Sequence, residues 1–232
     1  MPDALHEKPV QHSQAGNEDR LELPRLYAIL DIDCLVNRGS TESDSALLAR
    51  VLDFASELHA GGVRLLQYRA KRLPVRAALD HARALRRLLP DVKLIMNDRA
   101  DLCLAAGFDG VHVGQDDLHP EAVRRLVGRR IVGVSTHNPE QVREASATPA
   151  NYVAVGPVFA TSSKLNPDPV VGLEGVRRAR QLTAKPLVAI GGITLENCRQ
   201  VIEAGADSLA IISALFQQPR QSAERFIQVI SG

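Results

Sequence analysis

The sequence has few cysteines, almost no net charge and no long apolar run. Its three cysteines, Cys34, Cys103 and Cys198, are far apart and include no Cys-x-x-Cys pair, so they signal neither a disulfide framework nor a zinc site. This cysteine content fits a reducing cytoplasm, where we expect the protein to work. The formal net charge of +1 gives no reason to expect nucleic acid or an anionic membrane as a partner, and it leaves a homo-oligomer open.

No stretch approaches the roughly 18 consecutive apolar residues that a membrane span requires, so we expect a soluble protein. The first 20 residues are polar, lack the apolar run of a signal peptide, and show neither helical nor strand periodicity. We therefore expect residues 1–20 to form a disordered tail and residues 21–232 to form one catalytic domain. A chain of 232 residues, 45% of them hydrophobic, can bury the core of such a domain.

Short runs rich in Val, Ile and Leu recur along the chain and predict eight strands, at 26–33, 63–69, 93–98, 110–114, 130–136, 152–158, 186–193 and 208–213. Stretches with helical spacing separate most of them, as at Val123, Leu126 and Val127. This alternation predicts a parallel sheet. Eight units without an obvious linker favour an α/β fold of the (β/α)8, or TIM barrel, type. An open dinucleotide-binding sheet is not supported, because no Gly-x-Gly-x-x-Gly loop follows the first strand.

Three segments share a junction pattern in which Ala-Gly is followed within a few residues by an expected strand. They are HAGGVRLL, AAGFDGVHV and EAGADSLAI. Glycine just past a helix end commonly adopts the left-handed cap conformation. We therefore expect these glycines to end helices and lead into strands.

In barrels of this kind, active sites lie at the C-terminal ends of the strands, so the polar residues there are candidates for chemistry. Acidic, basic, hydroxyl and glycine residues all occur at the expected ends. They are Gln67, Arg69, Lys71, Asn97, Asp98, Asp116, Asp117, Ser135, Thr136, His137, Thr161, Ser162, Ser163, Lys164, Gly191, Gly192 and Ser213.

The charged members of this set suggest a metal-bound polyphosphate rather than a bare anion. Arg69, Lys71 and Lys164 supply positive charge for phosphate oxygens, although each could instead be a solvated rim residue. Asp98 and either Asp116 or Asp117 follow neighbouring strands, so their carboxylates could meet on one Mg²⁺ ion. The alternative for the paired acids is that they solvate the loop and favour the start of the next helix.

Gly191, Gly192 and Ser213 lie at the ends of the expected seventh and eighth strands, where such barrels frequently bind a phosphate. Backbone amides without side chains can approach a phosphate closely, but the glycines could also serve only a tight turn. His112 alternates with valines in its strand and is interpreted as a hydrogen-bonded core residue without an assigned role. His137 is a weak acid–base candidate because no carboxylate partner can be identified from the sequence.

Several of these segments, in this order, resemble the thiamine phosphate synthase family. The resemblance rests on QYRAK, MNDRADLCLAAGFDGVHVGQDDL, GVSTH, VGPVFATSSK with VGLEGV, and AIGGI with AGADSLAIISAL, and it covers nearly everything after residue 24. It implies a (β/α)8 barrel that joins 4-amino-2-methyl-5-(diphosphomethyl)pyrimidine to a thiazole phosphate with Mg²⁺. Thiamine phosphate and pyrophosphate are then the products: pyrophosphate leaves first, and the thiazole nitrogen captures the pyrimidine methylene cation.

The resemblance also implies roles for individual residues. The pyrimidine diphosphate site would comprise Gln67, Arg69, Lys71, Asn97, Ser135 and Lys164, with Lys164, Ser135 and Arg69 acting in catalysis. The metal ligands would be Asp98 and Asp117. The thiazole phosphate site would comprise Thr161, Ser162, Ser163, Gly192 and the backbone of Ile212 and Ser213.

QYRAK departs from the family pattern at Tyr68 and Ala70, but both should alternate away from the site. The polar, proline-punctuated segment 159–172 could close over the site as a lid. Two other functions stay open: a thiazole tautomerase, which has no diphosphate leaving group, and a non-catalytic sensor of thiazole or thiamine phosphate.

Overall fold

A closed barrel of eight parallel strands forms the centre of the molecule, as the sequence predicts. The structure is a computed structural model that describes residues 21–36, 43–161 and 168–231. The strands follow one another in chain order, and β1 closes the ring against β8. They are β1 (Leu26–Asp31), β2 (Leu65–Arg69), β3 (Lys93–Asn97), β4 (Gly110–Val113), β5 (Ile131–Thr136), β6 (Tyr152–Val155), β7 (Leu187–Ile190) and β8 (Ser208–Ile211). The expected tail, residues 1–20, lies outside the described residues.

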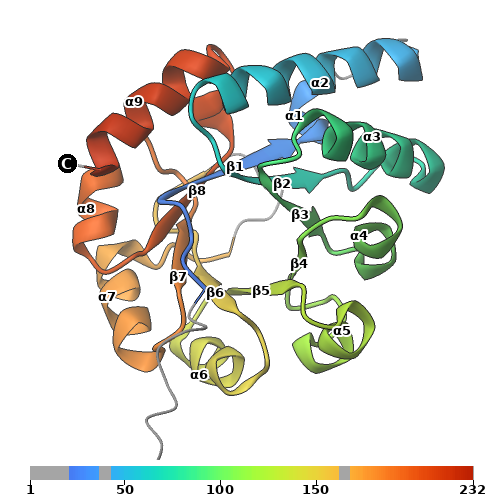
Figure 1. The fold of residues 1–232 in the computed structure, drawn as a ribbon. Coiled ribbons are helices and arrows are strands. Elements are labelled where there is room, and N and C mark those ends of the chain that lie inside the picture. Colours follow the sequence, from blue (N-terminus) through green and yellow to red (C-terminus); the bar gives the residue numbers. More distant parts are fainter. Residues whose placement is uncertain (1–20, 37–42, 162–167, 232) are drawn as a thin grey trace, which may run out of the picture.

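Helices surround the ring of strands (Figure 1). The α-helices are α1 (Ile32–Leu35), α2 (Asp44–Ala60), α3 (Val75–Leu88), α4 (Ala100–Ala106), α5 (Pro120–Val127), α6 (Pro139–Ala147), α7 (Gly172–Leu182), α8 (Cys198–Glu203) and α9 (Pro219–Ser231), and the 3₁₀ helix η1 spans Ser213–Leu215. Their apolar faces pack on the outward side chains of the strands and form the larger part of the core. A smaller cluster, which includes Tyr27, Ile95 and Tyr152, fills the inside of the barrel.

The prediction of a first strand that continues to residue 33 is wrong. Ile32 and Asp33 belong to α1, and the chain turns there because the Asp31 carboxylate accepts the Asp33 N–H at 3.1 Å as a helix N-cap. Asp31 is consequently the last residue of β1.

The junction glycines mostly behave as predicted. Gly107 and Gly205 have φ angles of 69° and 110°, in the left-handed region. In HAGG, however, Gly62 has the left-handed φ of 95°, whereas Gly61 has a φ of −76°. Gly61 is needed for packing, because a Cβ there would lie 2.5 Å from the Arg220 carbonyl oxygen of α9.

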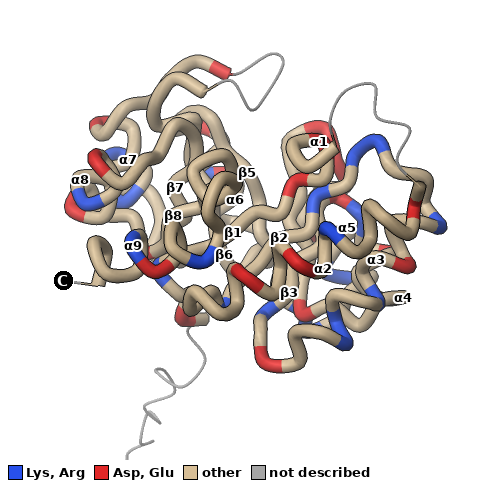
Figure 2. Tube along the Cα trace, turned by 90° about the horizontal axis from the view of Figure 1, so that it is seen from above, with Lys and Arg blue, Asp and Glu red and all other residues tan. Residues whose placement is uncertain are grey.

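Charges of both signs are interspersed around the molecule in the view of Figure 2. This distribution agrees with the small formal net charge of the sequence. None of the helices in the described part of the chain has both the length and the apolar character needed to span a membrane.

Candidate functional site

The C-terminal ends of β2, β3 and β4 bring several predicted site residues together. The Lys71 Nζ lies 3.1 Å from Asp98 Oδ2, and Asp98 in turn is hydrogen-bonded to the side chain of Asp117. The Lys71 side chain is half exposed, whereas that of Asp98 is largely buried. A cation and two carboxylates from consecutive strand ends therefore share one place, as expected from the sequence.

Asp98 has an unusual backbone conformation and a perturbed carboxyl group. Its φ of 60° lies in the left-handed region, and its N–H donates to the His112 carbonyl oxygen at 2.7 Å. Burial raises the pKa of Asp98, and the hydrogen bond to Asp117 raises it further, while Lys71 lowers it. Backbone strain of this kind concentrates at functional sites, where the surroundings hold it in place.

The structure distinguishes the two adjacent acids, of which the family resemblance implies Asp117 as a metal ligand. Asp117 is partly buried, and its Oδ2 accepts the Gly114 N–H at 2.8 Å, which directs the carboxylate back toward the strand ends. Asp116 is exposed. Asp117 is thus the acid that faces Asp98.

The donor set suits a hard divalent cation. No cluster of three or more His, Cys, Asp or Glu side chains that could hold a metal occurs in the described ranges, so the pair Asp98 and Asp117 has no third protein ligand of these types there. Mg²⁺ is usually held by one or two carboxylates together with substrate phosphates and water. Two carboxylates within hydrogen-bonding reach repel each other when both are ionised, and a cation between them would relieve that repulsion.

Arg69 is anchored by an acid that the sequence analysis did not identify. Its Nη1 donates to the Asp31 Oδ2 at 2.5 Å, across the register pair that joins the ends of β1 and β2. The Asp31 carboxyl is almost fully buried, and its burial raises its pKa although Arg69 lowers it. Asp31 ends the first strand, which is where site residues were sought. It was not considered because the expected strand continued to residue 33.

A chain of hydrogen bonds crosses the barrel interior from β2 to β5. Gln67 Nε2 donates to Tyr27 Oη at 2.8 Å, and the hydroxyls of Tyr27 and Tyr152 lie 3.0 Å apart. Tyr152 Oη is 2.9 Å from His112 Nδ1, and His112 Nε2 is 2.8 Å from Ser135 Oγ. Burial lowers the pKa of His112 to about 4, so the ring is neutral near pH 7. Gln67 and Ser135 were predicted site residues, whereas Tyr27, Tyr152 and His112 were not.

The two glycines that were predicted to lie at a phosphate site pack against the loop after β6. Gly191 and Gly192 have φ angles of 102° and 64°. A Cβ on Gly191 would lie 2.5 Å from Pro157, and one on Gly192 would lie 2.5 Å from the Ala160 carbonyl oxygen. Close packing and left-handed backbone therefore account for both glycines, so their presence alone does not indicate a phosphate site.

The other predicted residues of this region are only partly described. Ser162, Ser163 and Lys164 lie outside the described residues, as does the middle of the expected lid, whereas Thr161 is half-buried. Ile212 is half-buried beside β8, and the exposed Ser213 begins η1.

Two further candidate residues, Asn97 and His137, lie at the ends of β3 and β5. Asn97 ends β3 and is half-buried beside His112 of β4. His137 Nδ1 lies 2.6 Å from the Gly156 carbonyl oxygen and 3.6 Å from Asp168 Oδ2, a carboxylate that the sequence had not indicated.

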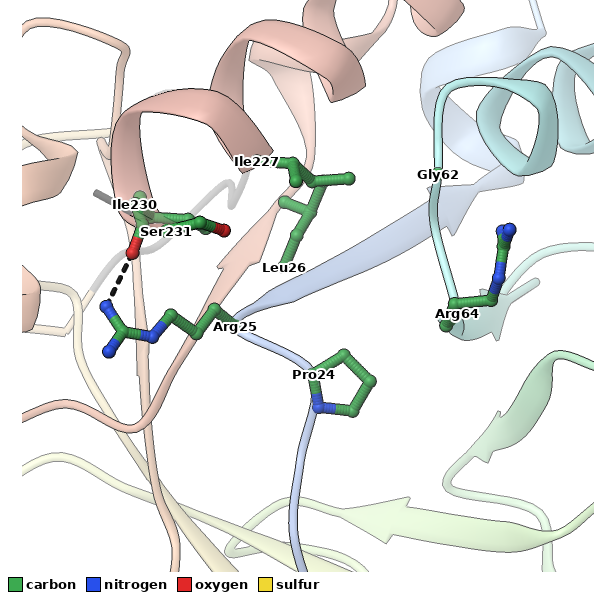
Figure 3. A pocket seen from close by; sticks show the side chains of 8 residues that line it. All are labelled: Pro24, Arg25, Leu26, Gly62, Arg64, Ile227, Ile230 and Ser231. Carbon is green, nitrogen blue, oxygen red and sulfur yellow. Dashed lines mark hydrogen bonds between the residues drawn. The ribbon is translucent and has the colours of Figure 1, made fainter.

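A pocket of about 310 Å³ opens at the opposite end of the barrel (Figure 3). Its lining includes Arg25 and Leu26 at the start of β1 and Ile230 at the end of α9. The Arg25 guanidinium donates to the Ile230 carbonyl oxygen. None of the predicted site residues lines this pocket, which lies at the N-terminal end of the strands, away from the end where barrels of this kind have their active sites.

Comparison with known proteins identifies the family. The family model described as thiamine monophosphate synthase matches residues 40–215. A thiamine-phosphate synthase from Koribacter versatilis (strain Ellin345) is 58% identical over 212 residues, which cover 90% of this chain and 97% of the relative. One from Chloroflexus aurantiacus (strain ATCC 29366 / DSM 635 / J-10-fl) is 45% identical over 193 residues, with 82% and 84% covered.

A solved structure has the same fold. The thiamine phosphate pyrophosphorylase from Pyrococcus furiosus aligns with a TM-score of 0.75 and 30% identity, over 89% of this chain and 95% of that one. The range that the family model matches, residues 40–215, contains Arg69, Asp98, Asp117 and Ser135. The chain therefore belongs to the thiamine monophosphate synthase family.

Proposed function

We propose that this protein is a transferase of the cytoplasm that joins 4-amino-2-methyl-5-(diphosphomethyl)pyrimidine to a thiazole phosphate, with release of pyrophosphate. The observation that carries the proposal is the cluster of Lys71, Asp98 and Asp117 at the strand ends. Two paired carboxylates beside a cation suit a metal-bound diphosphate better than a lone phosphate. Family membership supports the same reaction.

In this proposal, Asp98 and Asp117 hold the Mg²⁺ ion. The ion would supply positive charge that stabilises the departing pyrophosphate. Arg69, Lys71 and Lys164 would neutralise the remaining negative charge on the same leaving group. Asp31 would hold the Arg69 guanidinium in place through the 2.5 Å contact, so that less side-chain freedom is lost when the diphosphate binds.

The remaining residues would align the two substrates. Gln67, Asn97 and Ser135 would hold the pyrimidine ring over the barrel. Thr161, Ser162, Ser163, Gly192 and the backbone of Ile212 and Ser213 would hold the thiazole phosphate. Once pyrophosphate departs, the electron-rich aminopyrimidine stabilises the methylene cation and the thiazole nitrogen captures it, so alignment matters more than side-chain acid–base chemistry.

The two alternatives use only part of this site. A thiazole tautomerase has no diphosphate leaving group and would leave the cluster of Asp98, Asp117 and Lys71 without a purpose. A sensor could retain every binding residue and still release no product. Turnover with both substrates therefore distinguishes the synthase from the two alternatives.

The test is to incubate the purified protein with both substrates and Mg²⁺ and to quantify thiamine phosphate and pyrophosphate. We expect equal amounts of the two products, and no product when Mg²⁺ is removed by a chelator. Asp98→Ala and Lys164→Ala should both slow the reaction severely. Binding of both substrates without release of pyrophosphate would contradict the synthase function and favour the sensor.

A further inference from the structure

The hydrogen-bond chain inside the barrel links two predicted pyrimidine contacts through three residues that have no assigned role. Gln67 and Ser135 stand at its ends, and Tyr27, Tyr152 and His112 stand between them. All but Ser135 are buried, and Ser135 is half-buried at the end of β5. This hydrogen-bond chain therefore connects Gln67 to Ser135 through side chains that are shielded from bulk water.

The rings in this chain are held in place by packing. The Tyr27 and Tyr152 rings meet edge to face at a centroid distance of 6.1 Å, and the His112 ring stacks on Tyr152 at 5.5 Å. Tyr152 occupies the space that a side chain on Gly133 would fill, because a Cβ there would lie 2.0 Å from Tyr152 Cζ. Gly133 thus provides the space that lets Tyr152 cross the interior.

With Gln67 Nε2 as the first donor, we infer one arrangement of protons that lets every group in the hydrogen-bond chain both donate and accept. Tyr27 Oη accepts from Gln67 Nε2, so its own proton is available to Tyr152 Oη. The Tyr152 proton then goes to His112 Nδ1, which must be unprotonated to accept it. A neutral imidazole then carries its proton on Nε2, and this N–H donates to Ser135 Oγ.

This arrangement leaves the Ser135 hydroxyl proton free for a ligand. If every hydrogen bond ran in the opposite direction, Oε1 of Gln67 would have to face Tyr27. His112 Nε2 would then accept the Ser135 proton. Ser135 and His112 would then form a nucleophile–base pair. The contact of Gln67 Nε2 with Tyr27 favours the first arrangement, in which the Ser135 hydroxyl is a hydrogen-bond donor to a ligand.

We propose that Tyr27 and Tyr152 are positioning residues that hold His112 in its Nε2–H tautomer and thereby present the Ser135 hydroxyl as a donor to a ring nitrogen of the pyrimidine substrate. This proposal rests on the proposed function for the identity of the ligand. In the same hydrogen-bond chain, Gln67 Nε2 donates to Tyr27, which leaves Gln67 Oε1 to accept from an amino group of the substrate. The proposed pyrimidine substrate carries both a ring nitrogen that can accept and an amino group that can donate, one for each of these residues.

The tautomer can be measured without any substrate. Protonated and unprotonated imidazole nitrogens differ strongly in ¹⁵N chemical shift, and the His112 signals are those that disappear in His112→Gln. We expect the wild-type protein to show a protonated Nε2 and an unprotonated Nδ1. In Tyr152→Phe, which keeps the ring beside Gly133 but removes the donor, we expect the tautomer to become mixed. A wild-type His112 protonated on Nδ1 would overturn the proposal.

Enzyme kinetics tests whether Tyr152 contributes to the reaction, and Tyr68 offers a matched control. Tyr68 is also a buried tyrosine whose hydroxyl contacts a histidine Nδ1, that of His81 at 3.1 Å, but it lies outside the barrel interior. Tyr68→Phe and Tyr152→Phe should lower the melting temperature similarly. Only Tyr152→Phe should lower kcat/KM for the pyrimidine diphosphate, by about ten-fold, with KM for the thiazole phosphate unchanged.

Tyr27→Phe breaks the hydrogen-bond chain one step earlier and leaves the Tyr152 contact to His112, so we expect a smaller change of the His112 tautomer than in Tyr152→Phe. Equal kcat/KM values in Tyr152→Phe and Tyr68→Phe would refute the positioning role. If the wild-type protein forms no thiamine phosphate at all, the proposed function fails, while the ¹⁵N spectra still decide whether the chain holds the His112 tautomer.

Discussion

Replacing Asp117 by asparagine should lower kcat for thiamine phosphate formation by about 100-fold or more. The reason is that an amide has no negative charge to hold Mg²⁺ beside Asp98, and metal stabilisation of a leaving group contributes several kcal/mol to the transition state. The measurement is the rate of pyrophosphate release at saturating substrates over a range of Mg²⁺ concentrations. We expect a lower maximum and a shift of the curve to higher Mg²⁺ concentration.

The adjacent acid supplies the control for this experiment. Asp116 is exposed, and substitutions at exposed positions usually change free energies by less than about 0.5 kcal/mol, so Asp116→Asn should keep a rate within about two-fold of wild type. If the two asparagine variants lose activity equally, or if Asp117→Asn is fully active, Asp117 is not the metal ligand.

Replacing Arg69 by leucine should destabilise the protein by about 3 kcal/mol near neutral pH. Arg69 compensates the buried Asp31 carboxylate, and removal of one partner of a buried ion pair leaves an uncompensated charge. Urea denaturation of the wild type and the variant measures the difference in the free energy of unfolding.

The loss should depend on pH in a defined direction. Burial already raises the pKa of Asp31 in the folded protein, and the removal of Arg69, which lowers it, would raise it further. A carboxyl group whose folded pKa is raised stabilises the fold most below its unfolded pKa of about 3.9, and that contribution is lost as the pH rises through the folded pKa. The deficit of Arg69→Leu should therefore be small near pH 4 and grow toward pH 7.

The double variant Arg69→Leu, Asp31→Asn separates stability from function. It removes the buried charge together with its partner, so we expect it to recover most of the lost stability at neutral pH while the rate stays low. A double variant as unstable as the sum of the two single variants would show that Asp31 and Arg69 do not act as a pair.

The barrel could be predicted because its strands have both faces buried and are read as short runs of Val, Ile and Leu. The approach of Asp98 to an acid of the next strand end followed from the same reasoning, since parallel strand ends meet at one edge. Position along the chain did not decide which of two adjacent acids faces Asp98, whereas the family resemblance implied Asp117. That choice depends on a backbone contact, the Gly114 N–H to Asp117.

The hydrogen-bond chain inside the barrel was not predicted from the sequence, for a different reason. Tyr27 and Tyr152 are 125 positions apart in the chain, and no periodicity relates them. His112 was interpreted as a core residue, and its burial confirms that part. Its partners, Ser135 of β5 and Tyr152 of β6, lie 23 and 40 positions further along the chain, so only the closed fold reveals them.

Binding of pyrophosphate, measured by calorimetry with and without Mg²⁺, tests most directly whether Asp98 and Asp117 form a metal–diphosphate site. We expect one Mg²⁺-dependent site per chain in the wild type and in Asp116→Asn, and loss of that site in Asp117→Asn. Pyrophosphate binding that is equally strong without Mg²⁺, or that persists in Asp117→Asn, would contradict a metal–diphosphate site at Asp98 and Asp117.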